Sequence, residues 1–505
     1  MSGSSLKCRC LLSFLLLACS SARLDPALSQ APATRAAPRV WSYEVAAGAG
    51  ARELSVHAAL PPGVPEELEL DRFAHPFLRE LELHTAQGWR ASSASGPIWR
   101  IPECRVSGCE LRYRYLLGEA AQAIDRFGFA ALRGGALLAP PSTWLLHPRD
   151  YEGDDRYRLS VRSDPPLSFV SGVPLSQSAD RGREGSSREA PAELLFEAPY
   201  SAFGRFREQR VALPGGTIVA SVGLDAGPLA LTPEQLDSAL RASARLISDY
   251  YGRFPVRELA LIVVPAAGSE VFGMQLGNGG ASILLFVGRE ATELSPESEW
   301  VLVHELFHLG FPTLPRRHLW LAEGLASYQE PLARARAGFI SEQQLWREFL
   351  EGLPKGLPAP GDGGLDGTQS WGRTYWGGAI FCLLADLRIR VDSAQHFSLD
   401  DALRGIFDAG GDTRVRWSIA QTLAAGDRAI GGGVLGELYQ EHAAAAVEVD
   451  LAAIFRRLGV RFEVGQIVFD EVAEWAPLRR ALSAPAALQR AQAGLSSPGV
   501  PKSPL

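Results

Sequence analysis

Two histidines that lie four positions apart are the feature that most constrains this 505-residue chain. His304 and His308 fall in the apolar segment 301–308, and Glu305 directly follows the first of them. On a helix, residues four apart share one face, with Cβ atoms ~5–6 Å apart. Two imidazoles converging in this way suit one Zn²⁺ ion at Zn–N distances of ~2.0–2.1 Å. The chain has only nine histidines, so this H-E-x-x-H pattern is informative.

The residues around the pattern predict a short, capped helix. Segment 295–297 (Ser-Pro-Glu) is a start signal, with an N-cap residue, a proline and then an acid in the first turn. Gly310 and Pro312 predict the end of the helix. Glu305 is expected to hold a water molecule and take its proton, because it sits one position from a ligand. The alternative is a core helix with two structural histidines.

A catalytic zinc ion has three protein ligands and one open position, so a third ligand is needed. Glu323 lies fifteen positions after His308, in a helical segment, and is the predicted third ligand. The competing residue is His318, which follows two arginines at the end of a loop. We therefore expect one Zn²⁺ per chain, held by His304, His308 and Glu323.

Peptide hydrolysis develops negative charge on the carbonyl oxygen, and this charge needs a hydrogen-bond donor. Tyr375 follows the glycine- and proline-rich stretch 352–372 and stands near the start of an apolar helical segment. Its phenol is the candidate donor. The alternative is a tyrosine that packs at a helix end without a chemical role.

The N-terminus has the pattern of a targeting segment. Residues 1–18 combine two basic residues with a short apolar run and are predicted to be a signal peptide. The sequence Leu-Leu-Ala-Cys-Ser at 16–20 resembles a bacterial lipobox, which predicts a lipid on Cys19 and residues 19–39 as a tether. An ordinary secretory cleavage after Ala22 is the alternative. We expect an exported protein of the bacterial cell envelope, anchored in the membrane by lipid, or otherwise periplasmic or secreted.

The remaining chain predicts an α+β protein. Residues 40–213 contain alternating apolar segments separated by turn residues, which indicates an N-terminal antiparallel β-sandwich domain. Residues 214–395 are expected to form a mainly helical catalytic domain around the H-E-x-x-H pattern, and residues 396–483 a C-terminal helical region. Residues 484–505 are predicted to be a disordered tail. The polar insertion 177–191 is predicted to be a loop.

Cysteine content and charge narrow the function further. Cys104 and Cys109 flank a short turn and are predicted to form a local disulfide in an oxidising compartment, with two free thiols as the alternative. Cys382 lies in an apolar helical segment and is expected to be buried and inert. The net charge is −7 and no long basic run is present, so nucleic acid is not an expected partner.

Three segments together resemble a known family. The first is His304-Glu-Leu-Phe-His308, and the second is Trp320-Leu-Ala-Glu323-Gly-Leu-Ala-Ser-Tyr. The third is the segment 375–390, which starts as Tyr375-Trp-Gly-Gly-Ala-Ile-Phe and ends as Leu-Leu-Ala-Asp-Leu-Arg-Ile-Arg. They resemble the gluzincin zinc metallopeptidases, specifically the bacterial glycyl aminopeptidases, which are relatives of aminopeptidase N. The resemblance spans most of residues 40–462. It implies a thermolysin-like, mainly helical zinc-peptidase domain at 214–395 and a peptide or protein substrate. It also implies His304, His308 and Glu323 as zinc ligands, Glu305 as base and Tyr375 as transition-state donor.

The chain departs from that family in three ways. The gap between His308 and Glu323 is short, and no PDZ-sized segment follows Phe462. The family holds the substrate's free amine with a glutamate on the strand before the zinc helix, whereas segment 273–280 (Gly-Met-Gln-Leu-Gly-Asn-Gly-Gly) has no carboxylate. Exopeptidase specificity therefore does not follow. The alternative function is a non-catalytic peptide-binding or assembly lipoprotein on a peptidase scaffold.

Overall fold

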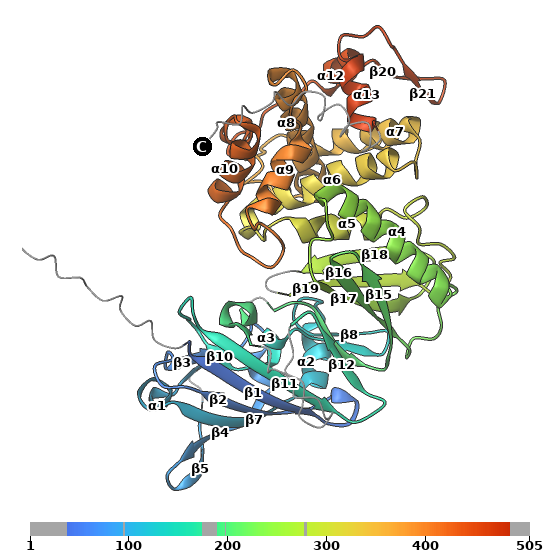
Figure 1. Cartoon of the computed structure of the whole chain (residues 1–505). Coiled ribbons are helices and arrows are strands. Elements are labelled where there is room, and N and C mark those ends of the chain that lie inside the picture. Colours follow the sequence, from blue (N-terminus) through green and yellow to red (C-terminus); the bar gives the residue numbers. More distant parts are fainter. Residues whose placement is uncertain (1–37, 94–95, 174–188, 197, 277–279, 485–505) are drawn as a thin grey trace, which may run out of the picture. The chain divides into compact units, whose positions relative to one another are not determined.

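The structure, a computed structural model, describes residues 38–93, 96–173, 189–196, 198–276 and 280–484. It is a mixed α/β protein in which several sheets precede a mainly helical region (Figure 1). The predicted signal peptide, Cys19 and the predicted tail beyond residue 484 lie outside the described residues, as does most of the predicted insertion 177–191. No helix in the described part of the chain is both long and apolar enough to span a bilayer.

A seven-stranded sheet, in the order β13-β11-β1-β2-β7-β4-β5, is the largest element of the first half. Side chains of β2 alternate, with every second residue facing the core. β1 pairs with β11 in parallel, so the expectation of a purely antiparallel sandwich is wrong for this pair. A long connection separates the two strands and lets the chain return in the same direction. The strands are β1 (Val40–Ala47), β2 (Leu54–Leu60), β4 (Leu78–Thr85), β5 (Gly88–Ala91), β7 (Cys109–Tyr115), β11 (Arg156–Ser163) and β13 (Ala190–Pro191).

Smaller elements complete this half. Cys104 and Cys109 are joined by a disulfide, as predicted. Two further sheets have the orders β10-β3-β6 and β12-β14-β9-β8. These elements are β3 (Glu67–Glu69), β6 (Ile98–Arg100), α1 (Pro102–Val106), α2 (Leu117–Ile124), β8 (Ala131–Arg133), β9 (Ala136–Leu138), α3 (Pro141–Trp144), β10 (His147–Pro148), β12 (Ser168–Ser171) and β14 (Ser201–Gly204).

A five-stranded sheet, in the order β15-β16-β17-β19-β18, supports the helical region. Its three middle strands run in parallel, and β18 is an antiparallel edge strand that contacts helix α5. Helix α4 links β16 to β17 and begins with a capping box formed by Thr232 and Gln235. The elements are β15 (Phe206–Leu213), β16 (Gly216–Gly223), α4 (Pro233–Tyr251), β17 (Glu258–Ala266), β18 (Val271–Leu276) and β19 (Ala281–Gly288).

Helices dominate after this sheet. A buried network holds three of them together, because Asp386 accepts hydrogen bonds from the Tyr328 hydroxyl (3.0 Å), the Arg390 guanidinium (2.8 Å) and the Leu399 N–H (3.0 Å). Cys382 is buried and has a free thiol, as predicted. The helices are α5 (Val301–Phe307), α6 (Leu319–Arg336), α7 (Glu342–Gly352), α8 (Gly378–Asp392), α9 (Leu399–Asp408), α10 (Ile419–Ile430), α11 (Val434–His442), α12 (Leu451–Leu458) and α13 (Ala476–Ser483).

The region 396–483 is not wholly helical as expected. Strands β20 (Val460–Glu463) and β21 (Gln466–Phe469) form a hairpin between α12 and α13. Val464 and Gly465 both have positive φ, which is the two-residue turn that favours a tight hairpin. The flanking β-branched and aromatic residues then extend as paired strands.

Candidate metal centre

Helix α5 and the 3₁₀ turn that continues it carry the two histidines of the H-E-x-x-H pattern, but the helix begins later than predicted. Residues 295–298 form a turn, and the helix starts at Val301. The Glu299 carboxylate accepts a hydrogen bond from the Val301 N–H (2.9 Å) and so satisfies the free end of the helix. The Ser-Pro-Glu pattern did not mark the start of the helix because proline is also common in β-turns. The helix ends at Phe307, next to the predicted stop, and a 3₁₀ turn carries His308.

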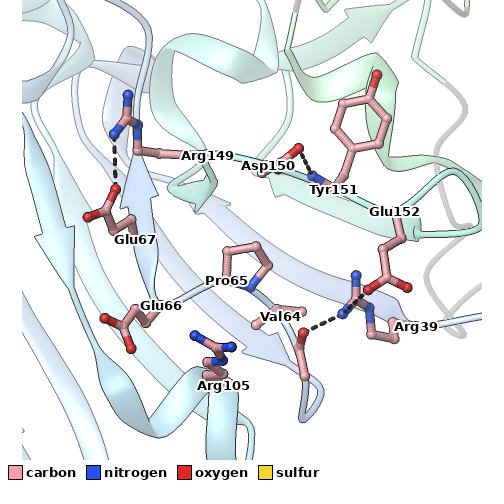
Figure 2. A pocket seen from close by; sticks show the side chains of 11 residues that line it. Arg39, Val64, Pro65, Glu66, Glu67, Arg105, Arg149, Asp150, Tyr151 and Glu152 are labelled. Carbon is pink, nitrogen blue, oxygen red and sulfur yellow. Dashed lines mark hydrogen bonds and ion pairs between the residues drawn. The ribbon is translucent and has the colours of Figure 1, made fainter.

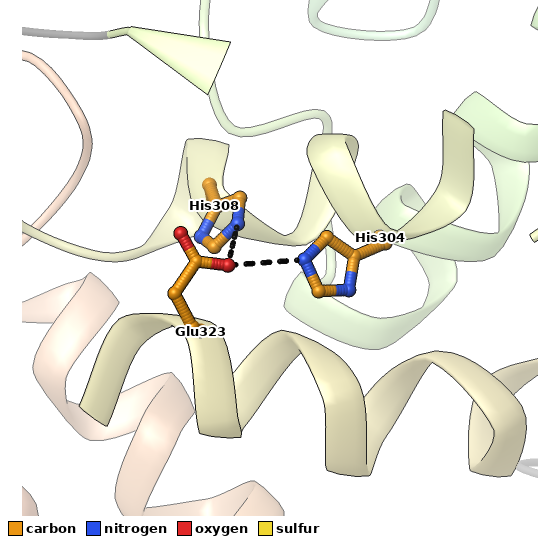
Figure 3. Close-up of side chains that lie close together, drawn as sticks. All are labelled: His304, His308 and Glu323. Atoms are coloured by element: carbon orange, nitrogen blue, oxygen red, sulfur yellow. Dashed lines mark hydrogen bonds and ion pairs between the residues drawn. The ribbon is translucent and has the colours of Figure 1, made fainter. Parts of the chain in front are cut away.

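The structure brings together the three predicted metal ligands (Figure 3). His304 and His308 lie on one face of α5 and its continuation, and Glu323 reaches them from α6. Glu323 Oε2 is 3.3 Å from His304 Nε2 and 3.5 Å from His308 Nε2. One ligand atom of each residue lies within 4.8 Å of the other two, and all three side chains are mostly buried.

His318, the competing third ligand, lies elsewhere although it is also buried. Its Nδ1 is 2.8 Å from Asp366 Oδ1, and its Nε2 accepts a hydrogen bond from Arg317 Nε (2.8 Å). Nδ1 therefore carries the proton and donates it to Asp366. With both ring nitrogens occupied, His318 has no atom left to offer a metal ion.

The donor set of the cluster fits a zinc ion. Zinc prefers imidazole and carboxylate ligands at ~2.0–2.2 Å in a tetrahedral arrangement, which places neighbouring donor atoms about 3.3–3.5 Å apart. The two imidazole–carboxylate distances of 3.3 and 3.5 Å match this spacing. Three protein ligands also leave one position open, as a catalytic zinc site requires.

The charges of the cluster favour the ligating form of Glu323. Burial raises the pKa of Glu323, but His308 and His304 outweigh this effect and hold the pKa well below its usual range. Burial lowers the pKa of His308, and the charge and hydrogen bond of Glu323 reverse the direction, so that the pKa is raised overall. Glu323 is therefore ionised, which is the state in which a carboxylate binds a cation.

Glu305 lies beside the cluster and is not one of the three grouped residues. Its side chain packs on Gly273 of strand β18, where an added Cβ atom would stand 2.6 Å from Glu305 Cγ. The backbone N–H of Gln275 donates a hydrogen bond to the carboxylate. Burial raises the pKa of Glu305, although His304 and His308 lower it. Gly273 and Gln275, from the segment that lacks a carboxylate, thus form one wall of the site.

Tyr375 also reaches the cluster. It lies in a π-helical turn, Arg373–Gly377, rather than in a first α-helical turn, and such turns are frequent at functional sites. Its ring stacks on His304, with ring centroids 6.0 Å apart, and its hydroxyl forms a hydrogen bond with Glu323. Burial raises the pKa of Tyr375, and Glu323 and Glu305 raise it further. The phenol therefore keeps its proton and is a hydrogen-bond donor.

Three further residues at the site were not predicted from the sequence. Trp300 packs edge-on against His304, with ring centroids 5.5 Å apart, so His304 lies between two aromatic rings. Burial raises the pKa of Tyr200, and the charge of nearby Glu305 raises the Tyr200 pKa further. Thr413 accepts a hydrogen bond from Gln275 Nε2 (2.5 Å). Tyr200 and Thr413 come from segments remote from the motif, so only the fold reveals their positions. Trp300 stands four residues before His304, a spacing that places the two side chains on one helical face.

The fold is that of the M1 zinc metallopeptidases, the class that includes aminopeptidase N. An aminopeptidase N family protein from Idiomarina loihiensis is similar to this chain with a TM-score of 0.64 and 14% identity, over 83% of this chain and 78% of the other. An M1 zinc metallopeptidase mutant from Deinococcus radiodurans, bound to a Tyr-Ser-Ala substrate, is similar with a TM-score of 0.52 and 16% identity, over 82% of this chain and 96% of the other. No protein-family model and no curated protein sequence matches the chain.

Proposed function

We propose that this protein is a zinc-dependent metallopeptidase that hydrolyses peptide bonds. One observation carries the proposal: Glu305, a buried carboxylate, lies beside a cluster of two imidazoles and a carboxylate whose spacing suits zinc. A bound Zn²⁺ would act as a Lewis acid and lower the pKa of water from 15.7 to ≈ 7. The fold that the chain shares with M1 zinc metallopeptidases supports the same class of reaction.

The residues of the site have distinct roles in this proposal. His304, His308 and Glu323 would hold the ion. Glu305 takes a proton from the attacking water molecule and transfers it toward the leaving amine. Tyr375 donates its hydroxyl proton in a hydrogen bond to the oxygen that becomes negative in the transition state. The present hydrogen bond between Tyr375 and Glu323 supports this role, because it directs the hydroxyl toward the cluster.

The substrate does not need a free amino terminus. Gln275 on β18 is the residue whose backbone contacts Glu305, and its side chain is neutral and already hydrogen-bonded to Thr413. An amide cannot provide the negative charge that would favour a substrate ammonium group. We therefore propose a glycyl-aminopeptidase-like architecture with relaxed or endopeptidase specificity.

A pair of measurements tests the proposal. Purified protein with zinc is incubated with a broad peptide library, and the products are identified by mass spectrometry. Glu305→Gln keeps the shape of the side chain but cannot take a proton, so it should retain zinc and lose ~10²–10⁴ in rate. Matched peptides with free and N-acetylated termini should be cleaved at similar rates. A strict requirement for the free terminus would refute the specificity alone.

The second candidate function is a non-catalytic peptide-binding scaffold. The absence of a carboxylate at Gln275 is the observation that favours it. Wild-type protein that holds zinc and binds peptides but cleaves none of the library would make this the better account.

A further inference from the structure

A cavity of about 210 Å³ lies next to the metal centre and shares Tyr375 with it. Trp371 forms part of its wall and stacks on Tyr375, with ring centroids 5.8 Å apart. Tyr375 stacks in turn on His304 at 6.0 Å. The three rings therefore form a continuous row from the cavity to a predicted metal ligand. The polar or aromatic residues of the wall include Arg316, Arg317, Gln369, Trp371, Thr374 and Tyr375.

The charged residues that line this cavity are all positive. Arg316 and Arg317 line it, and no acidic residue does. Neither arginine forms an ion pair with an acid within the part of the chain that the structure describes. Lys355 adds a third positive charge, with its Nζ 6.0 Å from the centre of the Trp371 ring. Such a set of unpaired cations favours a negatively charged ligand.

A larger cavity in the N-terminal half provides a contrast (Figure 2). It has a volume of about 480 Å³, and its lining contains other arginines together with acidic residues. There Arg149 pairs with Glu67 (2.9 Å) and Arg39 with Glu152 (3.3 Å), so its main charges neutralise each other. The cavity beside Tyr375 lacks such internal pairing and keeps its charge available for a ligand.

Arg317 is held in place by the buried residue that the sequence offered as a rival ligand. Its Nε donates to His318 Nε2, and His318 donates from Nδ1 to Asp366. Asp366 is itself fixed by hydrogen bonds from Trp320 Nε1 (2.8 Å) and the Tyr439 hydroxyl (2.7 Å). Among the described residues none bonds to the Arg317 terminal nitrogens, which leaves them for a ligand. A guanidinium fixed in this way loses little entropy when it binds a carboxylate through two parallel hydrogen bonds.

We propose that Arg316 and Arg317, with Trp371 as an apolar wall, form a carboxylate-binding subsite of the peptidase. The inference rests on the proposed function, because it assigns the subsite to a peptide held at the metal centre. The carboxylate comes either from an aspartate or glutamate side chain near the cleaved bond or from the C-terminus of a short peptide. His318 is a positioning residue that orients Arg317.

Peptides that differ by one charge test this proposal. In one series a glutamate replaces glutamine at each position around the cleaved bond of an amide-capped peptide; in the other a free C-terminal carboxylate replaces the amide. We expect a carboxylate at one position to raise kcat/KM about tenfold or more, mainly through KM, since charge-assisted hydrogen bonds are strong. A preference in the first series identifies a side chain, and one in the second identifies the terminus.

Arginine variants show whether the subsite causes the preference. Arg316→Gln and Arg317→Gln should lower kcat/KM for the charged peptide toward that for the neutral peptide, with kcat little changed, and Arg317→Lys should recover part of the difference. Arg245→Gln is the matched control, because Arg245 is an exposed arginine on α4 with 85% of its side chain accessible. Within the described part of the chain the Arg316 side chain forms no hydrogen bond, so its variant should fold even if Arg317→Gln does not.

Binding to Glu305→Gln separates this inference from the proposed function. Calorimetry with the same peptide pairs measures the carboxylate preference where no bond is cleaved. Equal affinity for charged and neutral peptides would overturn the subsite. So would a preference for the charged peptide that persists in both Arg316→Gln and Arg317→Gln. Absence of Glu305-dependent cleavage by the wild type would instead overturn the peptidase assignment.

Discussion

The backbone of Gly324 packs directly on that of Gly378, so that a Cβ atom added at Gly324 would stand 2.2 Å from the Gly378 carbonyl carbon. Helices α6 and α8 therefore approach each other here with no side chain between them. Glu323 precedes the first glycine and Tyr375 lies three residues before the second. The close approach allows a predicted ligand on α6 to meet a hydrogen-bond donor in the π-helical turn that leads into α8.

Gly324→Ala should separate the two helices and disturb the site. Overpacking of this kind costs ~1–3 kcal/mol of stability, and we also expect weaker zinc binding, because Glu323 moves with the helix. Thermal unfolding and zinc titration measure the two effects. Gly432→Ala is the control, since nothing lies within 4 Å of an added Cβ atom there. Unchanged stability of Gly324→Ala would show that the helices are free to shift.

Metal content tests the ligand set. The protein should bind one Zn²⁺ per chain, and His304→Ala and His308→Ala should each lose most of it, because only two of the three protein ligands of a catalytic zinc site would remain. Glu323→Ala should bind zinc more weakly. His318→Ala should keep full occupancy, since both its ring nitrogens contact other residues. Elemental analysis of the purified variants decides, and full occupancy in His304→Ala would disprove the assignment.

Tyr375→Phe should slow hydrolysis without loss of zinc. Removal of one donor to a developing oxyanion lowers kcat by about 10²–10³, while KM for peptides should change little. Steady-state kinetics on one good substrate measures both values. Tyr157→Phe serves as the control, because Tyr157 is a buried tyrosine in the seven-stranded sheet. An equal loss in both variants would point to a general effect on folding.

His147 should make the protein sensitive to acid. Burial lowers the pKa of His147 from 6.5 to about 4, although a hydrogen bond to the Pro148 carbonyl opposes the shift. Between these values the unfolded chain binds a proton that the folded chain does not, so the free energy of unfolding falls as the pH drops from 6.5 to 4, by about 2–3 kcal/mol. Denaturant unfolding across this range should show a smaller fall in His147→Asn than in the wild type. The exposed His396→Asn should keep the wild-type slope.

Cys19→Ser should release the protein from the membrane fraction. We propose that a lipid on Cys19 anchors the protein to the bacterial cell envelope, because lipid chains hold an otherwise soluble domain on a bilayer. Fractionation and mass spectrometry of the mature N-terminus provide the measurement. A wild-type protein that is soluble and begins at Arg23 would favour the secretory cleavage instead.

Spacing on a helix predicted much of the site. His304 and His308 lie together because four residues form about one helical turn, a rule that holds whatever surrounds the helix. Spacing alone does not predict that Glu323 is a ligand, because its distance from α5 depends on how α5 and α6 pack. His318 showed the ambiguity, since its sequence position allowed ligation and only the contacts of Asp366 and Arg317 exclude it.

Features that depend on tertiary contact could not be predicted. The parallel pairing of β1 with β11 joins segments more than a hundred residues apart, and no local pattern encodes its direction. The start of α5 at Val301 depends on the Glu299 carboxylate, which acts in place of the expected serine cap. The residues around Tyr375 indicated the start of an ordinary helix, whereas the structure has a π-helical turn there.

The contact between Gly273 and Glu305 makes position 273 a marker that can be read in sequence alone. Any side chain there would collide with the side chain that carries the carboxylate we assign as the base, since even a Cβ atom would come within 2.6 Å of Glu305 Cγ. A related chain with the full H-E-x-x-H pattern and a larger residue at this position would have to move the carboxylate. Such a chain is the natural place to look for a homologue that keeps the metal site and has lost the reaction.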